Sequence, residues 1–518
     1  MALPGVHVPC RHRPAHPANR RSRRRCLALT LALLVPCVHG DVVVACPASA
    51  ARCIRVGATA PLTGWASGQG NSAKRGAQLW ADTVNTQGGI AVGSGHLFVE
   101  LHMYDDTSSR DQTAALYEQL ISTDQVDYLL GPYGTSFSGR AAAVAAQHSR
   151  VIILGNAAGD SAYEAQAGAP SWTHVFGVVT TTAEYTVPTA QMLRSEHGAL
   201  TAATVSRSDN AFAADTAAGA LTSFSRSHSA GGPILDVVAS TNFAGDDDDN
   251  STGTPGEGWR ASIAAGIASA CAAQADTLWL FGLKGDANAL LLALAAQRES
   301  CQPKSVYISS GPTELSWVTA ANQLEDATGA KYLADMYKVL SAGQWTEPAA
   351  DTAGPTDALF QNVAGFRSRM EQFFPEVAVG DEIHHHAASA AAAGIVLGEA
   401  LKIATLPGAV VDAGGLPTQE ALATAVRGLV MSTFYGAIRF DDSGRNIGKG
   451  TITTQVQGGS VVPVWPTEHA HGDIVYPLNL AAIVAQEQAS PSPPPSSGAA
   501  AVCAQTVLPL LLACWLAL

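Results

Sequence analysis

The sequence predicts an α/β protein built from two similar units, and three patterns support this. Short apolar runs of strand length alternate with longer helical patterns over residues 54–154, and the same alternation restarts over 202–308. Strands that alternate with helices form a parallel sheet covered by helices on both faces. Three further helical segments and a late return to strand patterns, at 437–457, then indicate two lobes linked by several crossings of the chain.

The expected elements follow in order along the chain. In the first unit we expect strands at 54–58, 97–104, 128–130 and 151–154, with helices at 73–85, at 110–122 and after residue 139. In the second unit we expect strands at 202–205, 277–281 and 305–308, with helices near 211–225, 257–273 and 286–299. Helices at 357–374, 384–403 and 418–428 then precede strands at 437–440 and 450–457, with a turn at 441–444. Ligands bind such sheets at the carboxyl ends of the strands, which here places a site in a cleft between the lobes.

Composition and charge exclude several classes of protein. The 518 residues are 47% hydrophobic, which is enough to bury a large core, so disorder throughout is excluded. The formal net charge is −13, whereas a nucleic-acid-binding protein needs a basic face to neutralise phosphates. We therefore expect no nucleic-acid partner.

Residues 1–40 are predicted to be a signal peptide. Seven arginines precede an apolar run at 27–35, and small residues follow before the first acidic residue, Asp41. This order is typical of a secretory signal, and the compact apolar centre disfavours the alternative, an arginine-rich organelle transit peptide. Removing the segment takes seven positive charges from a net charge of −13 and leaves −20.

The C-terminal segment is predicted to anchor the protein to a membrane. Residues 484–500 form a Pro/Ser-rich linker, and residues 501–518 form a hydrophobic tail. The apolar run at 506–518 is shorter than the roughly 20 residues that span a bilayer as a helix. Small residues, a spacer and a terminal apolar run match a GPI-anchor signal. A marginal membrane tail or a faulty gene end is the alternative.

Four cysteines lie between these terminal segments, namely Cys46, Cys53, Cys271 and Cys301. An even number in an exported protein indicates two disulfides, with three pairings open. We expect Cys46–Cys53 and Cys271–Cys301, the latter because both cysteines precede a predicted strand. The stretch 240–258, which holds four consecutive aspartates, is expected to be a surface insertion with an N-glycosylation sequon at Asn250.

The segment 131–140 is the most informative motif. It follows a strand, opens an alanine-rich helix and carries Thr135 and Ser136 at the start of that helix. Hydroxyls and free backbone N–H groups at a helix N-terminus favour a bound carboxylate or another anion. A simple N-cap is the alternative, because serine and threonine are preferred there for capping alone.

Enzyme and cofactor motifs are incomplete. The nucleophile-elbow pattern around Ser136 lacks its last glycine, and no Asp and His follow in the expected order. The glycines at 68–70 resemble a dinucleotide fingerprint, but residues 59–67 separate them from the strand. Trp65, in the same loop, is either a wall of the cleft or a packed core aromatic. We expect no cofactor and no catalytic residue.

Metal motifs are incomplete as well. Adjacent histidines on a helix point about 100° apart, so His384, His385 and His386 are not expected to converge on one ion without other ligands. We interpret them as the start of a helix at the surface or at the edge of the cleft. The run at 441–444 lacks the alternating ligands of a calcium loop and is interpreted as a hairpin turn. We therefore expect no metal site.

Taken in order, these segments resemble the type I periplasmic-binding-protein-like family, in particular its leucine/isoleucine/valine-binding protein branch. The ligand-binding regions of animal glutamate and natriuretic-peptide receptors share that fold. The resemblance covers about 54–465 and depends on the order of the motifs. They are IRVG at 54–57, PLTG at 61–64, GAQL at 76–79, NTQGGI at 85–90, DDTS at 105–108, LGPY at 130–133 and GAIRFD at 436–441.

The resemblance implies a two-lobed periplasmic binding protein type I fold: two parallel-sheet Rossmann-like lobes joined by a three-crossing hinge, which closes on a small ligand. It places lobe 1 at 54–178 and 312–432, and lobe 2 at 179–311 and 433–480. It also implies that the protein is not an enzyme. The ligand positions that it assigns are Trp65 and Tyr133 as walls, Thr135 and Ser136 for a carboxylate, Ala157 and Gly159 for an ammonium, and Phe212 and Lys284 from lobe 2, with Glu314 as the carboxylate nearest to the place of the family's second-lobe acid.

The sequence departs from the family at the ammonium position. The family's threonine is replaced by Gly159, and Glu314 is the nearest carboxylate to the place of the family's acidic residue in lobe 2. An ammonium buried without a carboxylate is costly, whereas Lys284 would favour an anion. A carboxylate-bearing or neutral polar ligand therefore fits better than an ordinary α-amino acid.

Three functions follow, in order of preference. The first is an extracellular, membrane-anchored solute-binding protein that captures a small polar ligand, an amino acid or another small carboxylate, with a membrane protein as partner for signalling or transport. The second is a ligand-free interaction or co-receptor module of the same fold, which a filled cleft would favour. The third is an α/β enzyme, which needs an acid–base pair and a nucleophile in the cleft. The question of a dimer is left open.

Overall fold

The computed structural model describes residues 41–165, 172–245, 257–325, 333–345, 356–377, 383–412 and 414–479. The expected signal peptide, linker and hydrophobic tail lie outside the described residues, as does the sequon at Asn250. Those expectations therefore stay predictions.

The first lobe is built on a seven-stranded sheet with the order β1-β4-β2-β5-β6-β7. The seventh strand, β3, pairs with the N-terminal end of β4. Strands β4, β2, β5, β6 and β7 run parallel, whereas β1 and β3 are antiparallel to β4. The bounds are β1 Asp41–Val44, β2 Cys53–Ala60, β3 Ile90–Val92, β4 Gly95–Asp105, β5 Tyr128–Leu130, β6 Ile152–Leu154 and β7 Val175–Gly177. The central strands are apolar throughout because helices cover both of their faces.

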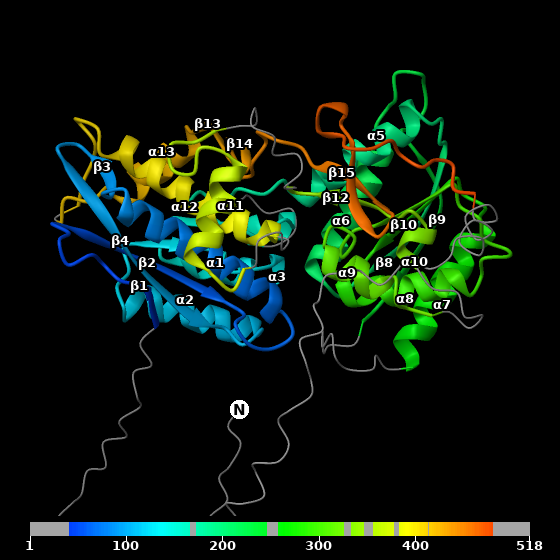
Figure 1. Ribbon diagram of the computed structural model, residues 1–518, viewed down its shortest axis with the longest axis horizontal. Helices are drawn as coiled ribbons and strands as arrows, with labels where there is room; N and C mark the ends of the chain where they lie inside the picture. Colours follow the sequence, from blue (N-terminus) through cyan, green and yellow to red (C-terminus); the bar gives the residue numbers. More distant parts are fainter. Residues whose placement is uncertain are drawn as a thin grey trace, which may run out of the picture. The chain divides into compact units, whose positions relative to one another are not determined.

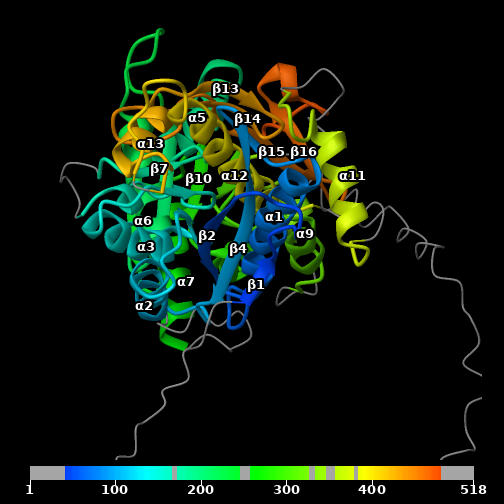
Figure 2. The ribbon, with the colours of Figure 1, turned by 90° about the vertical axis from the view of Figure 1, so that its left-hand side faces the viewer.

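Helices from two parts of the chain cover the first sheet (Figures 1 and 2). They are α1 Ser67–Thr86, α2 Arg110–Ser122, α3 Thr135–Gln147, α11 Val363–Phe373, α12 His385–Ala404 and α13 Gln419–Arg427, with a short 3₁₀ turn at Asp160–Tyr163. One core joins α1, α11, α12 and α13 to one face of the sheet, and a second core joins α2 and α3 to the other face. Successive strand residues alternate between the cores, as Ile153 and Ile152 do, because side chains point to opposite faces of a strand.

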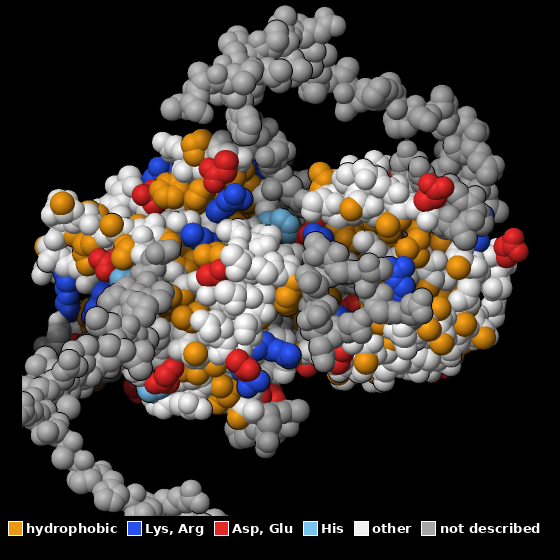
Figure 3. Space-filling view, turned by 90° about the horizontal axis from the view of Figure 1, so that it is seen from below, with side chains coloured by type: hydrophobic (Ala, Val, Ile, Leu, Met, Phe, Trp, Pro, Cys, Tyr) orange, Lys and Arg blue, Asp and Glu red, His pale blue; other side chains and the backbone are white. Residues whose placement is uncertain are grey.

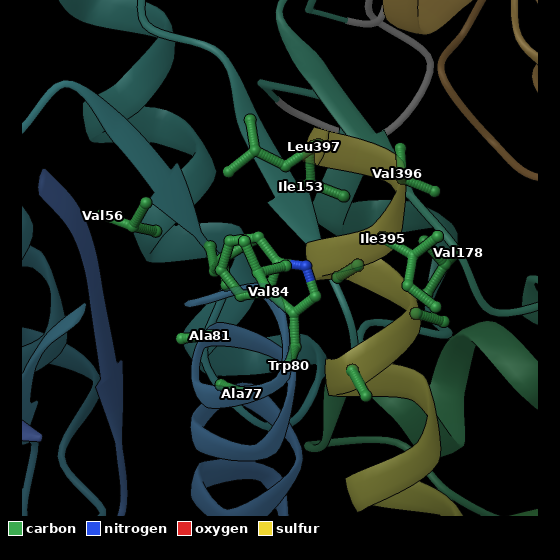
Figure 4. Packing of buried hydrophobic residues seen from close by; sticks show 14 of the residues in the cluster. Val56, Ala77, Trp80, Ala81, Val84, Ile153, Val178, Ile395, Val396 and Leu397 are labelled. Carbon is green, nitrogen blue, oxygen red and sulfur yellow. The ribbon is translucent and has the colours of Figure 1, made fainter. Parts of the chain in front are cut away.

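Small residues let α1 and α12 approach closely in this core. Trp80 of α1 packs against Gly394 of α12, where an added Cβ would lie 2.1 Å from the indole ring (Figure 4). Helix α12 is rich in alanine, and it is the one helix among the described residues that is long and apolar enough to cross a membrane. Because 83% of its most apolar window is buried inside the lobe, its composition is explained by core packing.

The second lobe contains another seven-stranded sheet, with the order β16-β15-β12-β11-β10-β8-β9. Its strands are β8 Thr201–Arg207, β9 Asp236–Phe243, β10 Thr277–Phe281, β11 Ser305–Ile308, β12 Leu340–Gly343, β15 Ile452–Gln457 and β16 Ser460–Trp465. Its helices are α4 Thr182–Tyr185, α5 Val187–Ser195, α6 Ala211–Phe224, α7 Glu257–Ala272, α8 Lys284–Ala295, α9 Leu315–Ala321 and α10 Leu333–Met336, with a 3₁₀ turn at Thr467–His469. The middle strands are parallel, and β15 and β16 complete one edge as antiparallel strands.

The lobe boundaries differ from those expected at two places. Strand β12 pairs with β11 and β15, and Trp317 packs into a core of the second lobe, so residues 312–325 and 333–344 belong to the second lobe and not to the first. The hairpin of β13 Val430–Thr433 and β14 Gly436–Arg439 packs through Phe434 and Ile438 into the first core. The first error arises because β12 is a short strand without a strand-like apolar run. Residues 240–243, expected in an insertion, are the end of β9.

Three crossings join the lobes near Thr180, Gln344 and Lys449. The side-chain amide of Gln344 accepts from the backbone N–H of Thr180 at 3.0 Å and donates to its carbonyl at 2.7 Å. Thr180 Oγ1 donates to the carbonyl of Lys449, and the Lys449 ammonium donates to the carbonyls of Gln344 and Tyr435. Burial lowers the pKa of Lys449 to about 7. Side-chain to backbone hydrogen bonds therefore tie the three crossings to one another.

The described residues contain two disulfides. Cys46–Cys53 closes the short connection between β1 and β2, with 6.3 Å between the Cα atoms. Cys271–Cys301 links the end of α7 to the segment before β11, with a Cα separation of 5.0 Å. Both separations lie within the usual range for disulfides, and such bonds persist in oxidising compartments.

A buried carboxyl group in the first lobe should make stability depend on pH. Asp106 is fully buried, where Thr59 Oγ1 and the backbone N–H of Ser108 donate to it at 2.9 and 3.2 Å. Burial raises its pKa to about 7, so between pH 4 and 7 the folded chain holds a proton that the unfolded chain has released. The stability that this carboxyl contributes at low pH is therefore lost as the pH rises towards 7.

We expect Asp106→Asn to remove that loss. Relative to wild type, the free energy of unfolding of the variant should rise between pH 4 and 7, by up to about 1.4 kcal/mol per pH unit, and level off above 7. Urea unfolding of both proteins at several pH values measures the difference. Parallel curves across this range would contradict the assignment.

Candidate functional site

The loop that carries Trp65 is held by the motif at 105–108. The Asp105 carboxylate accepts from the backbone N–H groups of Leu62 and Thr63 at 2.9 and 3.2 Å and from Thr63 Oγ1 at 2.7 Å. Burial opposes ionisation, but these hydrogen bonds outweigh it and lower the pKa of Asp105. The half-buried Trp65 ring lies 5.9 Å from the ring of Phe137, at the start of α3. This motif therefore brings Trp65 to the carboxyl end of the first sheet.

The start of α3 offers unpaired backbone donors. Gly134 precedes the helix with a φ of 80°, a conformation that suits glycine. The backbone N–H groups of Thr135, Ser136 and Phe137 make no hydrogen bond to any other described residue, and neither does the Ser136 hydroxyl. Thr135 Oγ1 accepts from the backbone N–H of Gly159 at 3.0 Å. The geometry can hold an anion at Ser136, whereas Thr135 is engaged within the protein.

An acidic residue that sequence reasoning missed lies at the predicted ammonium position. Gly159 is so closely surrounded that an added Cβ would lie 2.4 Å from Thr135 Cγ2 and 2.6 Å from Asp215 Oδ2. Asp215 comes from α6 of the second lobe and accepts from Ser161 Oγ at 2.6 Å and from its N–H at 3.1 Å. Burial raises the pKa of Asp215. A carboxylate therefore does face Gly159, although no motif in the sequence marks it.

Lys284 and Glu314 form a second group, at the carboxyl edge of the second sheet. Lys284 Nζ donates to Glu314 Oε2, and His384 Nε2 lies 3.4 Å from the same oxygen. Burial opposes ionisation of Glu314, but His384 and Lys284 together lower its pKa to about 2. The charge of Lys284 is thus neutralised within the protein, so it does not supply the free positive charge that was expected.

The three histidines are arranged differently from the expectation. His384 is the N-cap of α12, with an extended ψ of 135°, and the helix begins at His385. The rings of His384 and His386 stack with centroids 5.3 Å apart, and those of His385 and His386 lie 3.9 Å apart. The expected divergence of about 100° assumed helical geometry at every residue, which the cap does not have. Burial lowers the pKa of His385 to about 3 and that of His386 well below its usual value.

The remaining predicted ligand residues lie beside the histidines or pack in the cores of the two lobes. Tyr133 contacts the His386 ring edge-on at 4.8 Å, so it joins the histidine group. Phe212, in the first turn of α6, lies 5.9 Å from the ring of Tyr185 and packs against a core of the second lobe. Ala157 is fully buried in the core beneath α3.

Two cavities lie away from the predicted ligand residues. One of about 10 Å³ sits within the first lobe beside Thr59 and Lys74, and a shallow depression of about 480 Å³ lies at Val43 and Phe373. Neither is lined by the predicted ligand residues. The surface in Figure 3 shows lysines and arginines singly or in small groups among acidic and uncharged side chains, with no continuous basic patch on that face.

The two Rossmann-like lobes, the three crossings and polar groups at the strand ends define a two-lobed binding protein of the periplasmic type I class. A comparison with protein families agrees, since residues 53–460 match the model described as periplasmic binding protein. The chain belongs to this family, whose members are solute-binding proteins and not enzymes.

Solved structures share the fold at low sequence identity. A branched-chain amino acid transporter substrate-binding protein from Streptococcus pneumoniae, in complex with isoleucine, is 15% identical with a TM-score of 0.57, over 79% of this chain and 98% of its own. A leucine-binding protein from Thermotoga maritima is 16% identical with a TM-score of 0.57, over 79% and 97%. A solute-binding protein of an ABC transporter from Rhodopseudomonas palustris, in complex with 3,4-dihydroxybenzoic acid, is 18% identical with a TM-score of 0.54, over 79% and 95%. At these identities the similarity shows the fold alone.

Proposed function

We propose that this protein captures a small carboxylate-bearing solute between its lobes. The observation that carries the proposal is the start of α3, where three unpaired backbone N–H groups and the Ser136 hydroxyl lie together at a helix N-terminus. Such a site favours an anion through direct hydrogen bonds and the helix dipole. Proteins of the same fold have been solved with isoleucine and with 3,4-dihydroxybenzoic acid, and both of these ligands carry a carboxyl group.

Asp215 decides between two ligand classes. Its carboxylate lies beside Gly159 and Thr135, close to Ser136, and it could accept hydrogen bonds from an ammonium group. With Asp215 ionised, the site would hold both ends of an α-amino acid. With Asp215 protonated, the site would suit a simple carboxylate, and burial raises the pKa of Asp215. An ordinary α-amino acid was disfavoured above because no carboxylate was expected beside the ammonium position. Asp215 lies at that position, so an amino acid is again a candidate ligand.

We also propose that the protein acts outside the cell, at the cell surface. The two disulfides and the family both fit an exported protein, and the terminal segments would direct secretion and hold the protein at the cell surface. A membrane protein would then receive the ligand or the signal. Release of the protein from isolated membranes by a phospholipase that cleaves GPI anchors would support the anchor, and retention in the membrane fraction would contradict it.

Ligand binding is tested by a thermal-shift screen of the secreted chain against amino acids, simple carboxylates and amides. A ligand at 100 times its Kd should stabilise the fold by about 2.7 kcal/mol. We expect Ser136→Ala to weaken binding at least tenfold, since a hydrogen bond to a charged group is worth about 1.5–3 kcal/mol. The exposed Ser262→Ala in α7 is the control and should leave the affinity unchanged.

Asp215→Asn separates the two classes of ligand. If the ligand is an amino acid, this variant should bind it at least tenfold more weakly, and if the ligand is a simple carboxylate, the variant should bind it equally or more tightly. A flat response to the whole panel from a folded sample would instead favour the second candidate, a ligand-free interaction module. The observation in favour of that candidate is that neither described cavity lies at the predicted ligand residues.

A further inference from the structure

We propose that His384, His385 and His386, together with Glu314, form a binding site for a divalent transition-metal ion of the Zn²⁺ class. One ligand atom from each histidine lies within 4.8 Å of the others. In a tetrahedral zinc site the ligand atoms are about 3.3 Å apart, since each Zn–N bond is about 2.0–2.1 Å long. The rings therefore need to approach by about 1.5 Å at most, which small side-chain rotations provide.

The cap of α12 explains why three consecutive histidines can converge. His384 has an extended backbone and stands outside the helix, so its ring turns back over the first helical residues. The result is a stack of His384 on His386, with 13° between the ring planes, and His385 lies beside His386. All three side chains are partly exposed, so an ion can enter from solvent.

His386 is oriented as a metal ligand is. Its Nδ1 hydrogen-bonds to Asn156 Oδ1 at 2.9 Å, and Ser389 Oγ donates to the same oxygen at 3.0 Å. The amide nitrogen of Asn156 in turn donates to the backbone carbonyl of His386. A ligating histidine usually donates its second ring N–H to such an acceptor, which fixes the tautomer and leaves the other nitrogen for the ion. In His386 that nitrogen is Nε2.

Glu314 would supply the fourth ligand from the other lobe. Its Oε2 lies 3.4 Å from His384 Nε2, and its side chain is 6% exposed. Three imidazoles and one carboxylate make a donor set that zinc accepts in closed tetrahedral sites. The ammonium of Lys284 forms an ion pair with Glu314, so it would compete with the metal ion for this carboxylate. A bound ion would join α12 of the first lobe to the start of α9 in the second, an effect distinct from solute capture at Ser136.

The test uses the secreted full chain without a polyhistidine tag, freed of metal with a chelator and titrated with ZnCl₂ by calorimetry in the absence of organic ligand. CoCl₂ serves as a spectroscopic probe, because tetrahedral Co²⁺ absorbs strongly in the visible. We expect one ion per chain. His386→Gln and Glu314→Gln should each weaken binding at least tenfold, and Lys284→Met should tighten it because the competing ammonium is gone.

Two results would overturn the proposal. Equal Zn²⁺ affinity in Glu314→Gln and wild type would mean that the ion binds a bare run of histidines, and absence of binding to wild type would exclude the site outright. His148→Gln is the matched control, because His148 also pairs with a glutamate, Glu118, at the surface, and it should bind Zn²⁺ as wild type does. If Glu314→Gln does not fold, the Zn²⁺ affinity of Lys284→Met is the deciding measurement. Unchanged affinity in that variant would count against Glu314 as a ligand.

Discussion

Gly76→Ala is expected to destabilise the first lobe by about 3 kcal/mol or more, the largest effect that we expect from adding a single methyl group. The Cβ would lie 2.0 Å from the carbonyl oxygen of Ala387 and 2.7 Å from its carbonyl carbon. Both atoms belong to the backbone of α12, which is buried beside α1 on the same face of the sheet, so neither can move without displacing the helix. The melting temperature should fall by several degrees, and urea unfolding gives the free energy.

Gly68→Ala, in the same helix, is the control for this effect. An added Cβ there meets nothing within 4 Å, so the substitution should be neutral or should stabilise the protein by about 0.5–1 kcal/mol through helix propensity. If both variants lost the same stability, the contact with α12 would not be the cause of the loss, since Gly68 has no such contact. Gly76→Ala with stability close to wild type would contradict the close packing of α1 on α12.

Gln344→Leu is expected to cost about 2–4 kcal/mol and to loosen the crossings between the lobes. Gln344 is 4% exposed, and its amide satisfies both the N–H and the carbonyl of Thr180. A leucine of similar volume would leave two buried backbone groups without partners, each costing about 1–3 kcal/mol. Because the bonds join two of the three crossings, the affinity for a captured ligand should fall as well, since a looser hinge makes closure more costly.

Gln112→Leu is the matched control, because Gln112 is exposed on α2. A surface substitution of this kind changes stability by no more than about 0.5 kcal/mol. Urea unfolding of the two variants and of wild type measures the difference. If Gln344→Leu were as stable as Gln112→Leu, the amide of Gln344 would not hold the crossings together.

The elements of the fold were largely predictable because each has a local signal. Residues 110–122 form α2 with the bounds expected, since Ser109 caps the helix and Asp111 lies in its first turn. Apolar runs such as 128–130 and 277–281 form buried parallel strands, as predicted. Strands with mixed composition, such as β9 and β12, were missed because neighbouring strands and not their own side chains stabilise them.

The candidate site was predictable only in part, because some of its residues have no local signal in the sequence. Ser136 stands out because a strand, a glycine and a helix start follow one another directly in the chain. Asp215 carries no such signal, because it lies inside α6 and meets Gly159 only when the two lobes are in contact. Glu314 and His384 are likewise 70 residues apart and lie 3.4 Å apart in space.

The sequence by itself therefore determined the class of fold, the order of most helices and strands, the family and the position of the strand, glycine and helix start that lead into α3. These features arise from hydrophobic periodicity, capping and the spacing of motifs, which act between residues close in the chain. Only the tertiary structure decided where the chain crosses between the lobes, which acid faces Gly159, and that three histidines converge beside Glu314. Those arrangements depend on side chains from distant segments, whose approach is set by packing of the whole core and not by any local pattern.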